Sequence, residues 1–424
     1  MKRILLYYKK TDIDRRIFPA TDYNTLWQEY GNLAGNSGNK LFIQACEQYL
    51  TKQDIEVGYL TEGMTNDFIN QNFDRVVFPT ANIFNERKNV LQSLNRMAEQ
   101  FEQIKIPIIV LGAGAQADCY DDLDSLANSI EKESKRFIQS VYQSGGEFSL
   151  RGYFTKELFD KWGFKSACVT GCPSMYQRGR NLSICKRNVK EIDFKPSVNG
   201  ELKTLRDAWW IKQFKNYRDA IYVDQSLFYD LFYNKAYIEN HKPLVRNIKE
   251  FVGKFSETGL QLIKEGRVRL FYDIPVWSDF FQRENIDFSI GERIHGNLIA
   301  LLNGVPAVVC PHDTRTRELA EFFEIPMVED VSSKRNIYEI YEESSYDAFN
   351  KNFASKFDNF EKFLVEQGVS YELDNRECFE QKVKEADFQY PTYMDENYLK
   401  KVTRIASMTK PLRQCRNVIT KIKN

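Results

Sequence analysis

The sequence lacks long hydrophobic runs and any excess of charge. No segment approaches the roughly 20 consecutive apolar residues of a membrane-spanning helix, so we expect no such span. The 59 basic and 59 acidic side chains cancel, which gives no reason to expect a nucleic acid partner. The apolar segment 4–8 is too short for the core of a signal peptide and is followed by charged residues. We therefore expect a cytoplasmic protein.

Histidine is scarce, and the cysteines form no metal-binding pattern. The chain has three histidines and eight cysteines, of which Cys168 and Cys172 are the closest pair. Without a second pair nearby or an H-E-x-x-H segment, we expect no metal site. The G-x-S-x-G motif of serine hydrolases is absent as well. We expect free thiols, with Cys172 a small buried residue rather than a nucleophile.

The length and the alternation of patterns predict the fold class. At 424 residues the chain is long enough for two domains, because single cores stop growing near roughly 250–300 residues. Buried-strand and helical patterns alternate, which predicts an α/β protein with two Rossmann-like, doubly wound domains facing across a cleft. The charged stretch 178–220 interrupts the alternation. We expect an N-terminal domain over 1–178, a C-terminal domain over 179–390 and a basic tail over 391–424.

The expected elements follow from hydrophobic periodicity and from turn residues. Strands are expected at 3–8, 55–59, 75–78, 107–111, 148–150, 167–170, 182–185, 220–223, 268–272, 288–290, 306–310 and 327–328. Helices are expected at 41–50, 86–104, 123–143, 155–162, 243–265, 277–284, 297–303, 315–323 and, interrupted, from about 337 to 384.

The segment 287–312 places polar residues between a strand and a helix. In such units ligands bind at the carboxyl ends of the strands. The turn after the strand holds Glu292, Arg293 and His295, followed by Gly296. A cation, a titratable imidazole and a glycine at a helix start suit an anionic ligand. The alternative is that His295 only caps a turn of a structural unit.

Three other strand ends carry residues suited to binding. The ten residues 31–40, which precede a predicted helix, hold three glycines and three asparagines. They form either a loop that cradles an anion or a substrate, or an ordinary turn. Small residues at 112–116 follow the strand 107–111 and let a substrate approach the backbone. Arg151 follows the last residue of a predicted strand. It either contacts an anion or is an ordinary surface arginine.

Several blocks together resemble the polysaccharide pyruvyl transferase family. They are GNLAGNSGN at 31–39, LGAGAQ at 111–116, LRGYFTKELF at 150–159, TGCPS at 170–174 and GERIHGNLIALLNGVPAVVC at 291–310, followed by 315–320. The Arg-x-His-Gly block is the specific one. Arg151 and Thr155 match the pattern Arg-Glu-x-x-Ser/Thr of the family, but Gly152 stands where the family usually has an acidic residue.

The resemblance implies a GT-B-like fold and a reaction. It implies transfer of a pyruvyl group from phosphoenolpyruvate to a sugar of a cell-surface polysaccharide, such as a capsule or exopolysaccharide, or of its lipid-linked precursor. The product is a ketal, phosphate is released, and no cofactor besides the donor is expected. A GT-B glycosyltransferase that uses a nucleotide sugar is the alternative, because a fold does not fix the chemistry. A non-catalytic glycan-binding protein is the third possibility.

The resemblance and the residue types together assign roles. The catalytic candidates are His295 and Arg293. The donor-binding candidates are Arg151, Arg293, His295, Gly296, Arg315 and Arg317, of which the last two rank second because residues at a helix start are often solvated. The acceptor-binding candidates are Asn32, Asn36, Gly38, Asn39, Gly114 and Gln116.

The donor's charge explains this choice of residues. Phosphoenolpyruvate carries about three negative charges, and arginine holds a carboxylate or phosphate through two parallel hydrogen bonds, which lysine does not. Beside a trianion, His295 is expected to be protonated and to serve as general acid or as a phosphate contact.

The C-terminal tail is basic. Residues 400–424 hold eight basic side chains and no acidic one. We expect either a solvated terminus or peripheral contact with the anionic inner face of the cytoplasmic membrane, at about 1 kcal/mol per basic residue near the surface. Such contact suits a lipid-linked acceptor.

Overall fold

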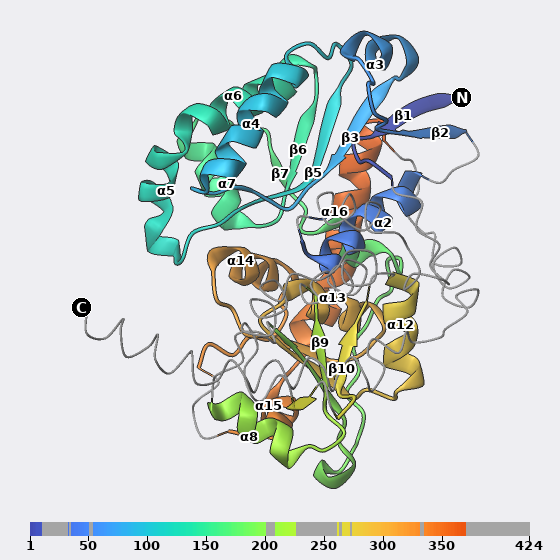
Figure 1. Cartoon of the computed structure of the whole chain (residues 1–424), viewed down its shortest axis with the longest axis vertical. Helices are drawn as coiled ribbons and strands as arrows, with labels where there is room; N and C mark the ends of the chain where they lie inside the picture. The colour runs from blue at the N-terminus through green and yellow to red at the C-terminus, as the bar shows by residue number, and fades with distance from the viewer. Residues whose placement is uncertain are drawn as a thin grey trace, which may run out of the picture. The chain divides into compact units, whose positions relative to one another are not determined.

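The computed structural model describes residues 1–10, 33, 35–50, 54–200, 208–225, 261–262, 265–271, 274–330 and 335–369 (Figure 1). These residues fall into two compact units. Unit 1 holds the described parts of Met1–Lys10, Gly38–Phe194 and Ile274–Ala386, and unit 2 those of Thr11–Ser37 and Lys195–Asp273. The strands form two parallel sheets, which confirms the predicted α/β class. The domain bounds 1–178, 179–390 and 391–424 stay a prediction, and residues 391–424 lie outside the described residues.

The larger sheet belongs to unit 1. Its strands run in the order β2-β1-β3-β5-β6-β7, with the short β4 beside β5, and all the pairings are parallel. The carboxyl ends of these strands therefore share one edge. The strands are β1 (Lys2–Leu6), β2 (Ile55–Tyr59), β3 (Arg75–Pro79), β4 (Asn82–Phe84), β5 (Ile108–Ala115), β6 (Glu147–Leu150) and β7 (Cys168–Val169).

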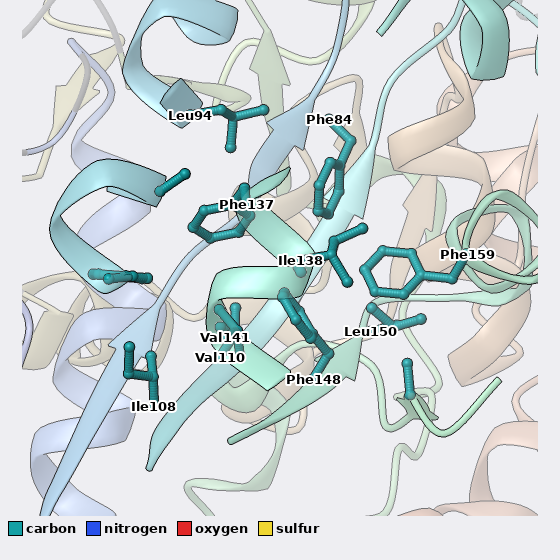
Figure 2. Packing of buried hydrophobic residues seen from close by; sticks show 14 of the residues in the cluster. Phe84, Leu94, Ile108, Val110, Phe137, Ile138, Val141, Phe148, Leu150 and Phe159 are labelled. Atoms are coloured by element: carbon teal, nitrogen blue, oxygen red, sulfur yellow. The ribbon is translucent and has the colours of Figure 1, made fainter. Parts of the chain in front are cut away.

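Helices connect and cover these strands. In the first part of unit 1 they are α2 (Lys40–Leu50), α3 (Asn66–Asn72), α4 (Lys88–Phe101), α5 (Leu123–Ser129), α6 (Glu131–Gln143) and α7 (Tyr153–Lys161). Aromatic side chains of α4, α6 and α7 pack onto the sheet: Phe84 meets Phe159 edge to face at 5.3 Å, and Phe137 meets Phe148 at 6.0 Å. Figure 2 shows these rings around Ile138. This apolar core fixes the strand ends that carry the site.

The second part of unit 1 contains a strand pair and five helices among the described residues. β11 (Phe288–Gly291) pairs in parallel with β12 (Ala307–Val309), and α13 (Ile294–Leu302) connects them. The other helices are α12 (Ile274–Arg283), α14 (Thr314–Phe323), α15 (Ile337–Glu343) and α16 (Asp347–Glu366). All nine residues of α13 are buried, as the apolar sequence predicts.

Unit 2 contributes three parallel strands in the order β10-β9-β8. They are β8 (Pro196–Gly200), β9 (Ile221–Asp224) and β10 (Val268–Leu270), and α8 (Ala208–Asn216) precedes β9. The guanidinium of Arg267 donates hydrogen bonds to the carbonyl oxygens of residues 214, 217 and 220. It thereby ties the end of α8 to the start of β9.

Most of the predicted elements are confirmed, but the end of β5 is not where the pattern placed it. The strand continues beyond Leu111 to Ala115, so that Gly114 is part of the strand. The continuation pairs with β4, which the sequence analysis missed, and the register shifts between Val110 and Ala113. Gly112 has a φ of +76° at this bulge, a conformation that glycine adopts without strain.

Three further predictions were wrong. The helix predicted over 123–143 is two helices, because the fully buried Ile130 leaves helical geometry. No strand forms at 182–185, where the side chain of Asn350 bonds both backbone groups of Ile184. β8 was missed because its sequence, PSVNG, is made largely of turn-forming residues.

Parts of two predicted helices cannot be compared. The helix predicted over 243–265 and the one expected to reach residue 384 lie partly outside the described residues. The predicted strand 327–328 is only a single bridge between Val309 and Met327.

Candidate active site

Arg151 lies at the carboxyl end of β6 and is 1% exposed. Its backbone nitrogen donates to the carbonyl oxygen of Ala113 at 2.9 Å, and its Nε donates to that of Gly112 at 2.9 Å. Its Nη2 is buried and has no hydrogen-bond partner among the described residues. The bulged end of β5 thus orients the guanidinium group and leaves the buried Nη2 group to donate to a ligand.

His295 lies in the first turn of α13. β11 ends at Gly291, whose carbonyl oxygen accepts a hydrogen bond from the side chain of Asn297 at 3.0 Å. Arg293 is the N-cap residue, so the helix begins three residues before the predicted position 297, and His295 is helical rather than part of a turn. His295 is 4% exposed, and its Nε2 is a second buried nitrogen with no partner in the described part of the chain.

Arg315 lies in the first turn of α14. Asp313 caps this helix by accepting a hydrogen bond from the backbone nitrogen of Thr316 at 3.0 Å. The other carboxylate oxygen of Asp313 contacts Nη2 of Arg315 at 3.1 Å and accepts a hydrogen bond from Gln116 at 3.0 Å. The Nε of Arg315 is buried, and no described residue bonds it.

The residue that follows Gln116 ties α14 to the end of β5. The backbone nitrogen of Ala117 donates to the hydroxyl of Thr314 at 3.0 Å, and its carbonyl oxygen accepts from the backbone nitrogen of Thr314 at 3.1 Å. The end of β5 and the start of α14 are therefore held together by paired hydrogen bonds.

The side chains of Arg151, Arg293, Arg315 and His295 interact electrostatically, and we call them the cationic cluster. Burial, and then the charge of Arg151, hold the pKa of His295 well below its ordinary value of 6.5. Arg315 and Arg293 lower this pKa further. The ring of Phe42 on α2 contacts two members: its centroid lies 5.9 Å from the guanidinium carbon of Arg151 and 5.8 Å from the centroid of His295.

Arg315 is subject to the same repulsion. Burial lowers its pKa, Asp313 raises it, and the charges of Arg151, Arg293 and Arg87 lower it again. Like charges gathered in a largely buried place are unfavourable unless a counter-charge arrives. A cluster of this kind, with three nitrogens that no described residue bonds, is suited to an anion that has several acceptor oxygens.

The structure qualifies the predicted protonation state of His295. Without a ligand, burial and the arginines keep its pKa low, so the imidazole is neutral near neutral pH. A multiply charged anion in the cluster offsets the charges of the arginines and raises this pKa. The predicted protonated form thus requires a bound ligand.

The remaining donor candidates differ in their surroundings. Gly296 is buried, and its backbone nitrogen donates to the carbonyl oxygen of Arg293 at 2.9 Å. Arg317 points to other partners: its Nη1 lies 2.6 Å from a carboxylate oxygen of Glu329 and 4.0 Å from one of Glu321. These carboxylates raise the pKa of Arg317.

The acceptor candidates are also separated. Asn32 lies outside the described residues, and Asn36 belongs to unit 2. Gly38 and Asn39 form the 3₁₀ turn that leads into α2, the helix that carries Phe42.

Gly114 and Gln116 lie at the cationic cluster. A Cβ atom on Gly114 would come within 2.9 Å of Cδ of Arg151, so glycine leaves room for the arginine. Gln116 bonds Asp313 and accepts a hydrogen bond from Asn82.

Gln116 and several other polar side chains line a cavity of about 520 Å³ within unit 1. The lining residues are Asn85, Glu86, Arg87, Gln116, Ala117, Asp118, Asp122, Ser125 and Leu126. Arg87 is one of the charges that lower the pKa of Arg315, so this cavity lies beside the cationic cluster. Its carboxylate, amide and hydroxyl groups are suited to sugar hydroxyl groups.

The other sequence expectations concern metals, thiols and membrane spans. Within the described residues, no group of three or more His, Cys, Asp or Glu side chains is arranged to hold a metal ion. Cys172 is buried, and its Sγ lies 3.0 Å from the hydroxyl of Ser174. None of the helices in the described ranges has the length and hydrophobicity needed to cross a bilayer.

Sequence reasoning missed three residues that shape the site, although two left a signal. Asp313 begins the series D-T-R-T, which is typical of an N-cap. Glu318 stands four residues before Phe322 and four after Thr314, on the buried face of α14. Nothing in the local sequence marks Phe42, because one more aromatic residue on an apolar helix face is typical of a core.

The sequence matches the model of one known family. The family model for polysaccharide pyruvyl transferase matches residues 36–314, more than half of the chain. The chain belongs to the polysaccharide pyruvyl transferase family. The matched range contains Arg151, Arg293 and His295, and it ends one residue before Arg315.

Two solved structures are similar over most of the chain. A UDP-N-acetylglucosamine 2-epimerase is 11% identical, with 88% of this chain and 98% of that chain covered and a TM-score of 0.36. The glycosyltransferase SnogD from Streptomyces nogalater is 12% identical, with 96% and 99% covered and a TM-score of 0.30. No curated protein matches the sequence.

Proposed function

We propose that this transferase moves the pyruvyl group of phosphoenolpyruvate onto two hydroxyl groups of one sugar and releases phosphate. The sugar is part of a cell-surface polysaccharide or of its lipid-linked precursor. One observation carries the proposal: Nη2 of Arg151, Nε2 of His295 and Nε of Arg315 are buried and unpartnered among the described residues. An anion with several oxygens supplies what these nitrogens lack.

The donor fits the charge of the cationic cluster. Phosphoenolpyruvate has a phosphate and a carboxylate, with about three negative charges in total, and the cluster has three arginines. The carbonyl oxygen of Gly112 accepts a hydrogen bond from Nε of Arg151 and orients its side chain, so less side-chain entropy is lost when Arg151 binds an oxyanion. Arg293 and Arg315 both precede or begin a helix, where the backbone dipole also favours negative charge.

His295 is the proposed general acid. Ketal formation adds one sugar hydroxyl to C2 of the enol phosphate, and this hydroxyl releases its proton to solvent, while the C3 methylene carbon takes up a proton and becomes a methyl group. The second hydroxyl then displaces phosphate from C2, and its proton leaves with the phosphate. In the donor complex the pKa of His295 rises, because the trianion offsets the charges of the arginines that lower it. The imidazolium then delivers the proton, and Arg293 and Arg315 neutralise the departing phosphate.

The cavity of about 520 Å³ beside Arg87 and Gln116 is the proposed acceptor site. Gln116 bonds Asp313, the partner of Arg315, so a sugar bound there would lie next to the donor. Asp118 and Asp122 offer acceptor oxygens for the hydroxyl groups that do not react.

We place the protein in the cytoplasm, in peripheral contact with the membrane. The six cysteines in the described residues, Cys46, Cys119, Cys168, Cys172, Cys185 and Cys310, are all unpaired, which agrees with a reducing compartment. The membrane contact rests on the basic sequence 400–424, which lies outside the described residues. No cofactor besides the donor is proposed.

Ligand-induced thermal stabilisation tests the donor. Phosphoenolpyruvate is expected to raise the Tm, since a ligand that binds only the folded state stabilises it by RT ln(1 + [L]/Kd). A panel of nucleotide sugars serves as the comparison. Stabilisation by a nucleotide sugar and none by phosphoenolpyruvate would instead assign a glycosyltransferase. Stabilisation by glycans alone would assign a binding protein.

A further inference from the structure

Glu318 is a carboxylate on α14 that is buried to 99% and bonds another helix. The backbone nitrogen of Thr155 donates to one carboxylate oxygen at 3.0 Å, and the hydroxyl of Thr155 donates to the other at 2.8 Å. Thr155 is the third residue of α7, whose N-cap is Gly152. Glu318 therefore caps α7 from a different helix, in place of the side chain that Gly152 does not have.

Gly152 is what allows α14 to come this close. A Cβ atom at position 152 would lie 2.9 Å from both the Cβ and the carbonyl oxygen of Glu318. The carbonyl oxygen is backbone, so rotation of the Glu318 side chain does not relieve the clash. The absence of a side chain at Gly152 therefore lets the carboxylate of Glu318 lie against the start of α7.

The capping contact is part of a chain of hydrogen bonds that reaches the cationic cluster. The backbone nitrogen of Ala115, at the end of β5, donates to the hydroxyl of Thr155 at 2.9 Å, and this hydroxyl donates to Glu318. Arg151 stands directly before Gly152, and Arg315 stands one turn before Glu318 on the same helix. Glu318 thus connects the segment that carries one arginine to the helix that carries the other.

We propose that Glu318 is a positioning residue, which clamps α14 onto the start of α7 and so holds Arg151 and Arg315 at the separation that one oxyanion bridges. This inference rests on the proposed function, because it takes the cationic cluster to be the donor site. Burial raises the pKa of Glu318 to about 8, while the bonds from Thr155 and the charge of Arg151 lower it. A carboxyl group with this cost of burial is retained for a specific contact.

A purely electrostatic role of Glu318 predicts a change in anion affinity in the opposite direction when Glu318 is removed. Above a pH of about 8, where Glu318 is ionised, its charge acts against anion binding at Arg151, so its removal there would tighten binding if geometry did not matter. If Glu318 positions the arginines, its removal weakens binding although a negative charge has been lost. The direction of the change in affinity therefore separates the two roles.

The test measures the calorimetric Kd for inorganic phosphate and for phosphoenolpyruvate at a pH above about 8, where Glu318 is ionised, and well below the Tm of each variant. Glu318→Ala is expected to weaken both by about tenfold or more, and Gly152→Ala, which removes no charge, is expected to act in the same direction. Thr155→Val breaks the hydrogen-bond chain and should weaken binding, whereas Thr155→Ser keeps the hydroxyl and should bind like wild type. The matched control is Glu157→Gln, an exposed glutamate on α7.

The outcomes are distinguishable. A folded Glu318→Ala variant that binds phosphate as tightly as wild type, or more tightly, overturns the positioning role. If this variant does not fold, the Thr155→Val and Thr155→Ser pair decides, and equal affinities for the two overturn it. A wild-type protein that binds phosphate but not phosphoenolpyruvate refutes the proposed donor and leaves the positioning role testable with phosphate. A wild-type protein that binds neither anion overturns both.

Discussion

Donor binding should take up a proton at His295. In the ligand-free protein, burial and the charges of Arg151, Arg315 and Arg293 keep the pKa of this imidazole well below 6.5, so it is neutral at pH 7. Phosphoenolpyruvate brings about three negative charges into the same place and raises the pKa. Between the lowered and the raised pKa, the complex binds one more proton than the free protein does.

The size of the effect follows from linkage. In that pH range the donor affinity falls by up to about tenfold, or 1.4 kcal/mol, for each unit by which the pH rises. The sign is fixed because the free imidazole is neutral and the bound one is charged, so that higher pH disfavours the bound state. Calorimetry in buffers of different ionisation enthalpy counts the protons directly, and the expected uptake approaches about one per donor.

His295→Gln provides the control. Glutamine keeps a hydrogen-bond donor but does not titrate, so the difference between wild type and variant isolates the imidazole. Measurements at about pH 8 also avoid the titration of the donor's own phosphate, whose second pKa is near 6. Equal proton uptake and equal pH slopes for the two proteins would refute the reasoning, since His295 would then stay neutral in the complex.

Four further predictions concern single groups. His295→Ala should abolish phosphate release from phosphoenolpyruvate and acceptor while the circular dichroism spectrum is unchanged; near-wild-type turnover would remove His295 from the chemistry. Arg151→Lys and Arg293→Lys should each weaken donor binding by about tenfold, or 1.4 kcal/mol, and unchanged calorimetric affinity would remove them from the site. Above about pH 6.5 the stability of the wild type should fall as the pH rises towards 8, by at most about 1.4 kcal/mol per unit, because the folded state holds a proton on Glu318 that the unfolded state has lost. Glu318→Gln should flatten this dependence of Tm on pH, and an unchanged slope would contradict it. Deletion of 400–424 should abolish flotation with anionic liposomes, and unaffected flotation would exclude the tail as a membrane contact.

The positions of the arginines were predictable because parallel sheets obey a simple rule. The carboxyl ends of the strands share one edge, so a polar residue directly after a buried strand is expected there. Arg151 after β6 and Arg293 after β11 follow this rule. The start of α13 was harder to predict. The turn after β11 ends at the N-cap residue Arg293, and the residues that follow it are already helical.

The contacts between helices were not predictable in the same way. Glu318 is separated by 163 residues from Thr155, and its role depends on how closely α14 approaches α7. Gly152 gave a hint of this contact, because a glycine at an N-cap leaves a backbone nitrogen without a capping side chain. Which residue supplies the missing oxygen depends on tertiary packing, about which local periodicity carries no information.

The bulge in β5 likewise depends on tertiary contacts, in this case of the backbone, that the local sequence does not indicate. The small residues 112–116 predicted a loop because glycine and alanine weaken a strand. Pairing with β4, whose sequence is only three residues long, extends the strand instead. The extension puts the carbonyl oxygen of Gly112 within 2.9 Å of Nε of Arg151, so the unexpected strand geometry is what orients the guanidinium group.

The ligand-free site is a source of instability that the donor is expected to remove. Arg151, Arg293 and Arg315 lower the pKa of His295, and the first two also lower that of Arg315, where the Asp313 carboxylate opposes them. A fold that keeps such a cluster without a ligand gives up stability to have the charges already in place when the donor arrives. The same repulsion makes the cluster selective, because a singly charged anion neutralises less of it than a trianion does. Phosphoenolpyruvate should therefore stabilise the protein more than inorganic phosphate at equal concentration, and both should stabilise it more than chloride.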